Sequence, residues 1–420
     1  MILKGVQLPS GKKADLAIED GLISKIGSIV ESGIDCHGLV ALPAMVDLHT
    51  HLREPGFEQS ETIESGSRAA AAGGYAAVFA MANTNPVQDS APVCEWVLDR
   101  GAEVNLVKVQ PIGAISKSLA GKELSAISEM ATSRAKVRVF SDDGNCLMDP
   151  DLMLKALLEV RKFGGVVAQH SQDHSLTPGA LMNEGDLNIE LGLAGWPRLA
   201  EEEIIARDAQ LALETDSRLH VCHLTTEGAV DVVRWAKSKG IKVTAEVTPH
   251  HLLLTEELVR TYDPVYKVNP PLRTSRDTQA LREALIDGTI DILATDHAPH
   301  SEEKKHCEWD SAAFGMTGLE IAARVLYQVL IRDGGSDWER FVQASSYQPA
   351  LIGGLVGFGQ IAEGQSANLM LFDPSVSSDS SRESFSLSSN SPWVGKKLFG
   401  QVVRTIYQGR ITFDDGAING

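Results

Sequence analysis

Short apolar segments alternate with amphipathic segments through most of this chain. The amphipathic segments carry apolar residues at helical spacing, and residues that favour helix starts, Asp149-Pro150, Thr225 and Thr274-Ser275, precede three of them. Eight strand–helix units in roughly 290 residues predict an α/β fold, a (β/α)8 TIM-like barrel rather than an open sheet. The expected strands lie near residues 46–50, 75–82, 105–112, 136–141, 165–169, 218–222, 242–247 and 289–294. The expected helices include residues 152–162, 200–214, 226–239, 276–287 and 318–332.

Both ends of the chain show a different pattern, in which apolar and polar residues alternate as in half-exposed strands. Asp20-Gly21 and Gln408-Gly409 are typical of tight turns between such strands. Neither end has room for a core of its own. We therefore expect residues 1–45 and 345–420 to form one small composite β-domain beside a barrel domain of residues 46–344.

The acidic balance of the chain narrows the choice of partners. A formal net charge of −18 argues against nucleic acid or an anionic membrane surface as the main partner. The longest apolar run, residues 69–82, has 14 residues, fewer than the about 20 that a membrane-spanning helix needs. The sequence predicts no secretory leader, and its five cysteines are scattered without a CxxC pair. We therefore expect reduced, unreactive thiols and a cytoplasmic protein.

Candidate metal ligands follow the expected strands. His49 and His51 end the first strand, and because side chains alternate along a strand, both imidazoles face the same way. Imidazole and carboxylate groups are the ligands that zinc-like ions prefer. Since the carboxyl ends of barrel strands meet at one rim, we expect a metal centre there. The later candidates are Asp142 or Asp143, His170, His223 and Asp296.

Neighbouring residues leave some alternatives. Adjacent strand residues face opposite ways, so only one of Asp142 and Asp143 is expected at the metal, and we favour Asp143. Other polar segments are interpreted as supporting or solvent-facing. These are His250, His251 and His297, the charged loop 302–310, for which a covering role is the alternative, and the serine-rich stretch Ser375–Ser391, which we expect to be an exposed loop.

These residues lie in longer motifs by which the chain resembles the amidohydrolase superfamily and, within it, the type I dihydroorotases. An HxH pair is shared across the superfamily, whereas HLREPG together with NPPLR and ATDHAPH is far more specific. The motifs extend over essentially the whole chain. They are DLHTHLREPG (47–56), MANTNP (81–86), FSDDG (140–144), QHSQD (169–173), VCHLTT (221–226), VTPHHLLLT (247–255), KVNPPLR (267–273), ATDHAPH (294–300), FGMTGLE (314–320) and SPWVGKKLFGQV (391–402).

The resemblance implies a zinc enzyme with one or two Zn²⁺ ions per subunit. The implied activity is the reversible cyclisation of N-carbamoyl-L-aspartate to L-dihydroorotate in pyrimidine biosynthesis. Metal-bound hydroxide would be the nucleophile, because a zinc-like ion lowers the pKa of bound water from about 15.7 to roughly 7. Asp296 would be the general acid–base. The small-molecule substrate is the expected partner, together with a homo-oligomer and, as a further option, aspartate carbamoyltransferase.

The resemblance also implies a role for each site residue. His49, His51 and Asp296 would hold one ion, His170 and His223 the second, and Asp143 would bridge the two. Arg53, Asn83 and His300 would hold the substrate carboxylate, while Asn269 and the backbone near Phe314 and Gly315 would meet the pyrimidine ring.

Two rival interpretations remain at this point. A hydantoinase or dihydropyrimidinase would use a carboxylated lysine on the fourth strand, but the lysine nearest that strand, Lys136, lies at its start, the wrong end. A scaffold without activity would be expected to lack metal ligands, and every ligand position is filled. The departures from the dihydroorotase pattern are small: Ala82 replaces an expected proline, and Gln172 stands where an acidic residue is common.

Overall fold

Eight parallel strands surround one core in the computed structural model, which describes residues 1–381 and 383–419. They form two sheets, β6-β7-β8 and β15-β14-β13-β10-β9. Single bridges between Gly113 and Phe140 and between Thr50 and His297 join the two sheets at both seams, so the strands close into a barrel. All eight expected strands are present. Their bounds are β6 Met45–Thr50, β7 Tyr75–Ala80, β8 Lys108–Pro111, β9 Val139–Phe140, β10 Val166–Gln169, β13 Leu219–Val221, β14 Val243–Val247 and β15 Ile292–Leu293.

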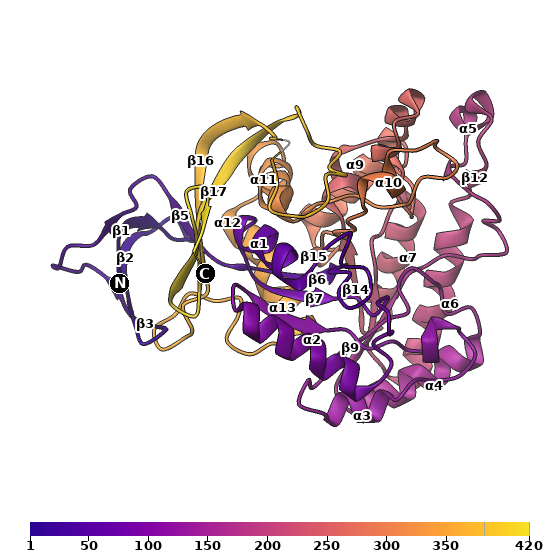
Figure 1. The fold of residues 1–420 in the computed structure, drawn as a ribbon, viewed down its shortest axis with the longest axis horizontal. Helices are drawn as coiled ribbons and strands as arrows, with labels where there is room; N and C mark the ends of the chain where they lie inside the picture. Colours follow the sequence, from indigo (N-terminus) through magenta and orange to yellow (C-terminus); the bar gives the residue numbers. More distant parts are fainter. Residues whose placement is uncertain (382, 420) are drawn as a thin grey trace.

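Helices pack around the outside of the barrel strands, and the inner face is closed off inside the barrel, so β6 and β7 are buried along their whole length (Figure 1). Asp149 caps α4 and Thr274 caps α9 through a capping box, as expected, whereas α7 is capped by Thr226 and not by Thr225. The helices of the barrel include α1 Ile63–Ala72, α2 Ala91–Val104, α3 Ile127–Thr132, α4 Pro150–Arg161, α6 Leu199–Thr215, α7 Glu227–Ser238, α8 Pro249–Leu253, α9 Ser275–Asp287 and α11 Ala322–Tyr327.

Strands from both ends of the chain share one sheet at the narrow end of the molecule (Figure 1). Its main order is β19-β18-β17-β16-β5-β1-β2-β3, with β4 paired to β1. Asp20 and Gly21, with φ of 50° and 80°, form the expected hairpin turn, because a tight turn of this kind needs left-handed residues. The bounds are β1 Ile2–Gln7, β2 Lys13–Glu19, β3 Leu22–Gly27, β4 Ile34–Asp35, β5 Val40–Pro43, β16 Leu369–Asp379, β17 Lys397–Tyr407, β18 Arg410–Asp414 and β19 Ala417–Ile418.

The junction between the sheet and the barrel does not fall at one residue. Ala350 and Ile352, in α13 (Gln348–Gly353), pack in the cluster that holds Leu48 and Phe79 of the barrel strands. The division at residue 345 therefore stays a prediction, while the composite sheet itself is observed.

The serine-rich stretch differs from its expected exposed loop. Part of it extends β16, and Ser386, Ser388 and Asn390 are buried. Ser386 donates a hydrogen bond to the Glu61 carboxylate, and the Ser388 hydroxyl donates to the Ser60 carbonyl at 2.6 Å. The prediction of an exposed loop is therefore wrong here, because these polar side chains find buried partners at the barrel.

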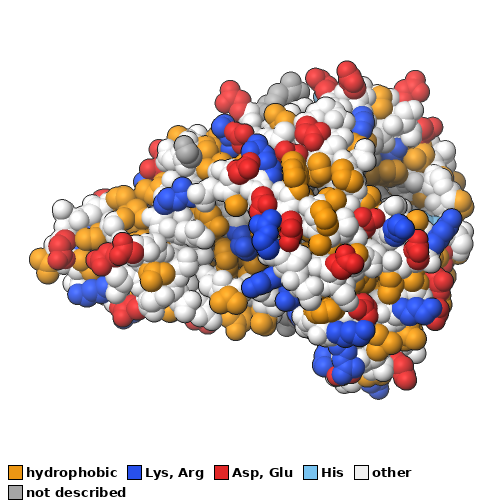
Figure 2. Space-filling model, turned by 60° about the horizontal axis from the view of Figure 1, so that its bottom comes forward, with side chains coloured by type: hydrophobic (Ala, Val, Ile, Leu, Met, Phe, Trp, Pro, Cys, Tyr) orange, Lys and Arg blue, Asp and Glu red, His pale blue; other side chains and the backbone are white. Residues whose placement is uncertain are grey.

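The surface gives no sign of a dominant charged region on the face shown in Figure 2, where acidic and basic side chains are interspersed. Among the described residues, none of the helices combines the length and the apolar character that crossing a membrane requires.

Candidate metal centre and substrate site

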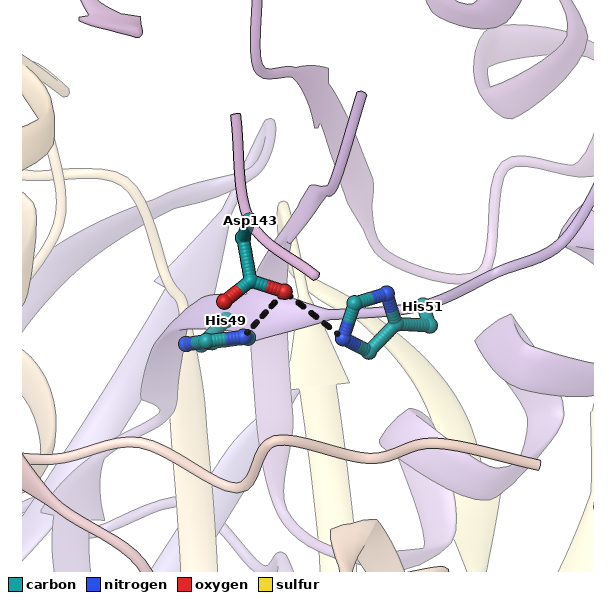
Figure 3. Close-up of side chains that lie close together, drawn as sticks. All are labelled: His49, His51 and Asp143. Atoms are coloured by element: carbon teal, nitrogen blue, oxygen red, sulfur yellow. Dashed lines mark ion pairs between the residues drawn. The ribbon is translucent and has the colours of Figure 1, made fainter. Parts of the chain in front are cut away.

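Six side chains from five strand ends converge at the barrel mouth. Asp143 lies at the centre, and its Oδ2 atom is 3.4 Å from His49 Nε2 and 3.3 Å from His51 Nε2 (Figure 3). Asp296 faces the same two histidines, with its Oδ1 atom 3.0 Å from His51 Nε2 and 3.4 Å from His49 Nε2. His49, His51 and Asp143 thus each offer one nitrogen or oxygen ligand atom within 4.8 Å of the others, as a cation site requires.

The other carboxylate oxygen of Asp143 faces a second pair of histidines. Its Oδ1 atom lies 3.4 Å from His170 Nδ1 and 3.3 Å from His223 Nε2, and these two ring nitrogens are 2.9 Å apart. Asp143 therefore lies between two histidine pairs, with one oxygen toward each. This is the arrangement in which one carboxylate can bridge two cations.

Asp142 points elsewhere. It accepts hydrogen bonds from the backbone N–H groups of Ile115 and Ser116, at 2.8 and 2.9 Å, and from the Ser116 hydroxyl. Its carboxylate is therefore used to hold the loop after β8. Asp143, and not Asp142, is the aspartate that lies in the cluster.

Glu246, inside β14, orients the histidines from below. Its Oε1 atom accepts from His49 Nδ1 at 2.6 Å and from the backbone N–H of His223 at 3.2 Å, while Oε2 accepts from His220 Nε2 at 2.9 Å. A carboxylate only accepts, so His49 carries its proton on Nδ1 and directs the Nε2 lone pair into the cluster. The sequence analysis missed Glu246, although a glutamate inside an apolar barrel strand was a detectable signal.

The electrostatics of the cluster favour a cation. Burial alone would lower the pKa of His49, but the carboxylates of Asp143 and Glu246 raise it well above 6.5. Burial alone would raise the pKa of Asp143, but the three facing histidines hold it well below 3.8; they are His49, His170 and His223. The centre thus keeps its carboxylates ionised in a buried place, which is costly unless positive charge compensates them.

A test of fit supports a metal at this point. His49 Nε2 is buried and has no hydrogen-bond partner within residues 1–381 and 383–419, although an unpaired buried nitrogen is costly. The raised pKa of His49 places a proton between this nitrogen and the carboxylates, and a bound cation would take the place of that proton. The residues present therefore fit a divalent metal centre of nitrogen and oxygen ligands.

A second buried group, His49 with Cys222 and Glu246, is also close enough to hold an ion. Its contacts have a simpler origin, because His49 Nδ1 already donates to Glu246 and burial raises the pKa of the Cys222 thiol. A thiol that stays protonated is a poor ligand. We therefore assign this group to the support of His49.

Arg53 and His300 lie next to each other beside the cluster, and only Arg53 carries a charge. Arg53 Nε donates to the Pro299 carbonyl at 3.1 Å, and its Nη2 atom lies 3.5 Å from His300 Nε2. Burial lowers the pKa of Arg53 to about 10, so it stays charged at neutral pH. Burial and the Arg53 charge lower the pKa of His300 to about 3, so His300 is neutral there. Its Nε2–H donates to the Phe314 carbonyl at 2.6 Å.

Asn83 and Asn269 reach the site through its ligands. Asn83 Oδ1 accepts from His51 Nδ1 at 3.0 Å, so the amide oxygen of Asn83 already holds the His51 ring in place. Asn269 Nδ2 donates to Gln172 Oε1 at 2.9 Å, and the same oxygen accepts from His170 Nε2 at 2.9 Å. Gln172, which departs from the expected pattern, therefore links a ligand histidine to the candidate ring-binding asparagine.

Phe314 and Gly315 lie next to His300, on the same side of the mouth. Gly315 N–H donates to the Lys267 carbonyl at 3.0 Å, and its own carbonyl accepts from Lys305 Nζ at 2.7 Å. The Phe314 ring is 36% exposed and has Lys267 Nζ 4.5 Å from its centroid. The exposed Phe314 ring is thus free to meet a ligand, whereas the backbone groups of Gly315 are already used.

Three site residues have the strained left-handed backbone. Arg53, His223 and Asp296 have φ of 63°, 30° and 45°. Such conformations cost of order 1–3 kcal/mol each in a residue with a side chain and cluster at functional sites. Two of the three remaining rim histidines make hydrogen bonds to the protein: His251 bonds to Thr248 and to the Pro270 carbonyl, and His297 bonds to Glu61.

Comparisons with known proteins show which family the chain resembles along its length. The family described as Dihydro-orotase-like matches residues 38–229. A dihydroorotase of Leifsonia xyli is 54% identical over 99% of this chain and 97% of its own length. A dihydroorotase of Mycobacterium tuberculosis is 46% identical over 100% of this chain and 99% of its own.

Solved structures share the fold at lower identity. An L-hydantoinase (dihydropyrimidinase) from Arthrobacter aurescens has a TM-score of 0.89 at 23% identity, covering 100% of this chain and 97% of its own. A D-hydantoinase from a Bacillus species has a TM-score of 0.86 at 22% identity, covering 100% and 96%. The structures share the barrel fold, and the dihydroorotase relatives that match nearly the whole chain make it a cyclic amidohydrolase. Since the relatives named dihydroorotase match nearly the whole chain, the chain belongs to the dihydroorotase family.

Proposed function

We propose that this chain interconverts N-carbamoyl-L-aspartate and L-dihydroorotate at the barrel mouth, with the six clustered side chains as metal ligands. The observation that carries the proposal is the position of Asp143, whose two oxygens each face a histidine pair. His49, His51 and Asp296 would hold one ion, and His170 and His223 a second. Zn²⁺ is the proposed metal, because imidazole and carboxylate sets of this kind suit it.

The metal would supply the electrophilic part of the chemistry. When bound, divalent cations lower the pKa of water and polarise a carbonyl, here that of the cyclic amide. What the protein itself must provide is a base, a carboxylate-binding group and a wall for the ring.

Asp296 is the proposed general acid–base. It is buried beside His49 and His51, which lower its pKa below 3.8 against the effect of burial, so the carboxylate is ionised at neutral pH. In ring opening it takes the proton of the attacking water and passes it to the departing ring nitrogen. In ring closure it removes a proton from the carbamoyl nitrogen.

Arg53 is the proposed partner of the substrate carboxylate. Its Nε–H donates to the Pro299 carbonyl, which would orient the guanidinium before substrate binds. A guanidinium fork matches a carboxylate in two parallel hydrogen bonds. Neutral His300 stands 3.5 Å away and adds no competing charge.

An amidohydrolase of hydantoins is the alternative that the fold alone would allow. Hydantoin and dihydrouracil lack the carboxylate that dihydroorotate presents, so their binding would leave the Arg53 charge without a partner. The arrangement therefore favours dihydroorotate, and turnover of dihydrouracil at a comparable rate would contradict this assignment.

The test is turnover of dihydroorotate and of carbamoyl aspartate by the metal-loaded protein. We expect activity that a chelator removes and Zn²⁺ restores. Asp296→Asn should lower kcat by about 10²–10⁴-fold in both directions, the range of general acid–base catalysis, with metal content measured in parallel. A variant that keeps its kcat would refute the role of Asp296. Association into a homo-oligomer or with aspartate carbamoyltransferase stays a prediction, and size-exclusion chromatography with and without the transferase tests it.

A further inference from the structure

Asn390 reaches the barrel mouth from the serine-rich segment near the end of the chain. It is 2% exposed, and its side chain makes three hydrogen bonds. Oδ1 accepts from the backbone N–H of His300 at 3.1 Å, and Nδ2 donates to the carbonyls of Ala298 and Gly315 at 3.0 and 3.1 Å. An asparagine amide has two N–H donors and one carbonyl oxygen, so both faces of the group are used.

These bonds join two backbone segments that run side by side. The N–H of Ala298 donates to the Met316 carbonyl at 2.8 Å, and the carbonyl of Asn390 itself accepts from Thr317 N–H at 3.1 Å. One segment carries His300 and the other carries Phe314 and Gly315. Asn390 therefore sits where the carboxylate-binding wall and the ring-binding edge meet.

The spacing between the segments is tight. A Cβ atom on Gly315, whose φ is 143°, would lie 2.8 Å from Ala298 Cβ and 2.9 Å from His300 Nε2. Small changes in the separation of the segments would therefore move the His300 ring and the Phe314 carbonyl to which it donates. The amide of Asn390 holds that separation because it binds both segments at once.

We propose that Asn390 is a positioning residue of the substrate site, which fixes the wall formed by His300 and Phe314 and so sets the affinity for the anionic substrate. This inference rests on the proposed function. It assigns a role in substrate binding to the serine-rich segment, which contributes none of the proposed metal ligands or substrate contacts.

A second group limits the damage when Asn390 is changed. Lys305, buried at 1% exposure, donates from Nζ to the carbonyls of Lys267, Ala313 and Gly315 at 2.8, 2.9 and 2.7 Å. The Gly315 segment is therefore tethered from its other side. We expect a variant of Asn390 to fold and to keep its metal ligands in place.

The sharpest variant is Asn390→Asp, which keeps the shape and replaces two donors by an acceptor facing two carbonyl oxygens. We expect KM for dihydroorotate to rise about tenfold while kcat falls by less than about threefold, because a loss of ground-state and transition-state binding alike appears in KM. The dissociation constant of orotate, which carries the same carboxylate and cannot ring-open, should rise by the same factor in calorimetry. Bound metal per chain should match the parent protein.

The exposed neighbour Ser389 provides the matched control. Ser389→Ala should leave KM and the orotate dissociation constant within about twofold of the parent. Asn390→Ser, which keeps one donor, replaces Asn390→Asp if the latter does not fold. Unchanged KM and orotate binding in a folded variant would overturn the inference, as would equal losses of kcat and metal at unchanged KM. Failure of the parent protein to turn over dihydroorotate would instead refute the proposed function.

Discussion

The two sides of the barrel mouth are built in different ways. On one side, the metal ligands follow directly from strand ends, and Glu246 inside β14 holds two of them from below. On the other side, the substrate wall of His300, Phe314 and Gly315 lies on a loop after β15 and is held by Asn390 and Lys305. The cluster thus depends on the barrel strands themselves, whereas the wall depends on Lys305 of the same loop and on Asn390, 90 residues from His300. Changes on the first side should affect kcat and metal content, and changes on the second should affect KM.

The largest effect should come from the centre of the ligand side. Asp143→Asn removes the charge between the two histidine pairs, and loss of metal stabilisation worth about 4 kcal/mol corresponds to a fall in kcat of about a thousandfold. Metal content should fall with it, as measured by elemental analysis. Asp142→Asn is the matched control, because Asp142 binds only the loop at Ile115 and Ser116. Equal losses in both variants would break the assignment of Asp143.

An intermediate effect is expected for Arg53, which lies beside His300 of the substrate wall. Arg53→Lys keeps the charge but loses the planar fork, so KM for dihydroorotate should rise about 10- to 100-fold, the cost of about 1.4–2.8 kcal/mol of carboxylate binding. Steady-state kinetics in both directions will show whether kcat is retained. A change in kcat at constant KM would place Arg53 with the ligands and would remove the contrast between the two sides.

The smallest effect is the contribution of His300 to the pH dependence of the free energy of unfolding. The pKa of His300 is lowered to about 3 by burial and by Arg53, whereas the unfolded chain takes up a proton near pH 6.5. The unfolded state therefore binds more protons between these values, and stability falls as the pH drops below about 6.5. Between pH 7.5 and 5 the free energy of unfolding should fall by about 1–2 kcal/mol less in His300→Gln than in the parent protein. Urea unfolding midpoints at the two pH values measure this difference. Parallel pH curves for the two proteins would contradict a neutral, buried His300.

The contrast also explains what the sequence could predict. The convergence of the six clustered side chains was predictable because HxH spacing and strand-end positions place them at one rim. Glu246 stands out locally as a glutamate in an apolar strand, but its contact with His49, 197 residues away, is set by tertiary structure and could not be predicted. Asn390 was missed because it lies in a serine-rich run that is typical of exposed loops, and only tertiary contacts bury it. The eight barrel strands were found because continuous apolar runs between helices are a strong local pattern.

The pairing of β5 with β16 has a consequence for how the chain is made. One side of Val40–Pro43 pairs with β1, but its other side pairs with Leu369–Phe372, so that side stays open until nearly the whole chain has been synthesised. At about 5–20 residues per second, that interval is on the order of 15 to 65 s. A strand edge left open for so long offers unpaired amide and carbonyl groups to other nascent chains. Expression yield in cells should therefore be more sensitive to substitutions in β5 and β16 than the buried position of these strands in the finished protein suggests.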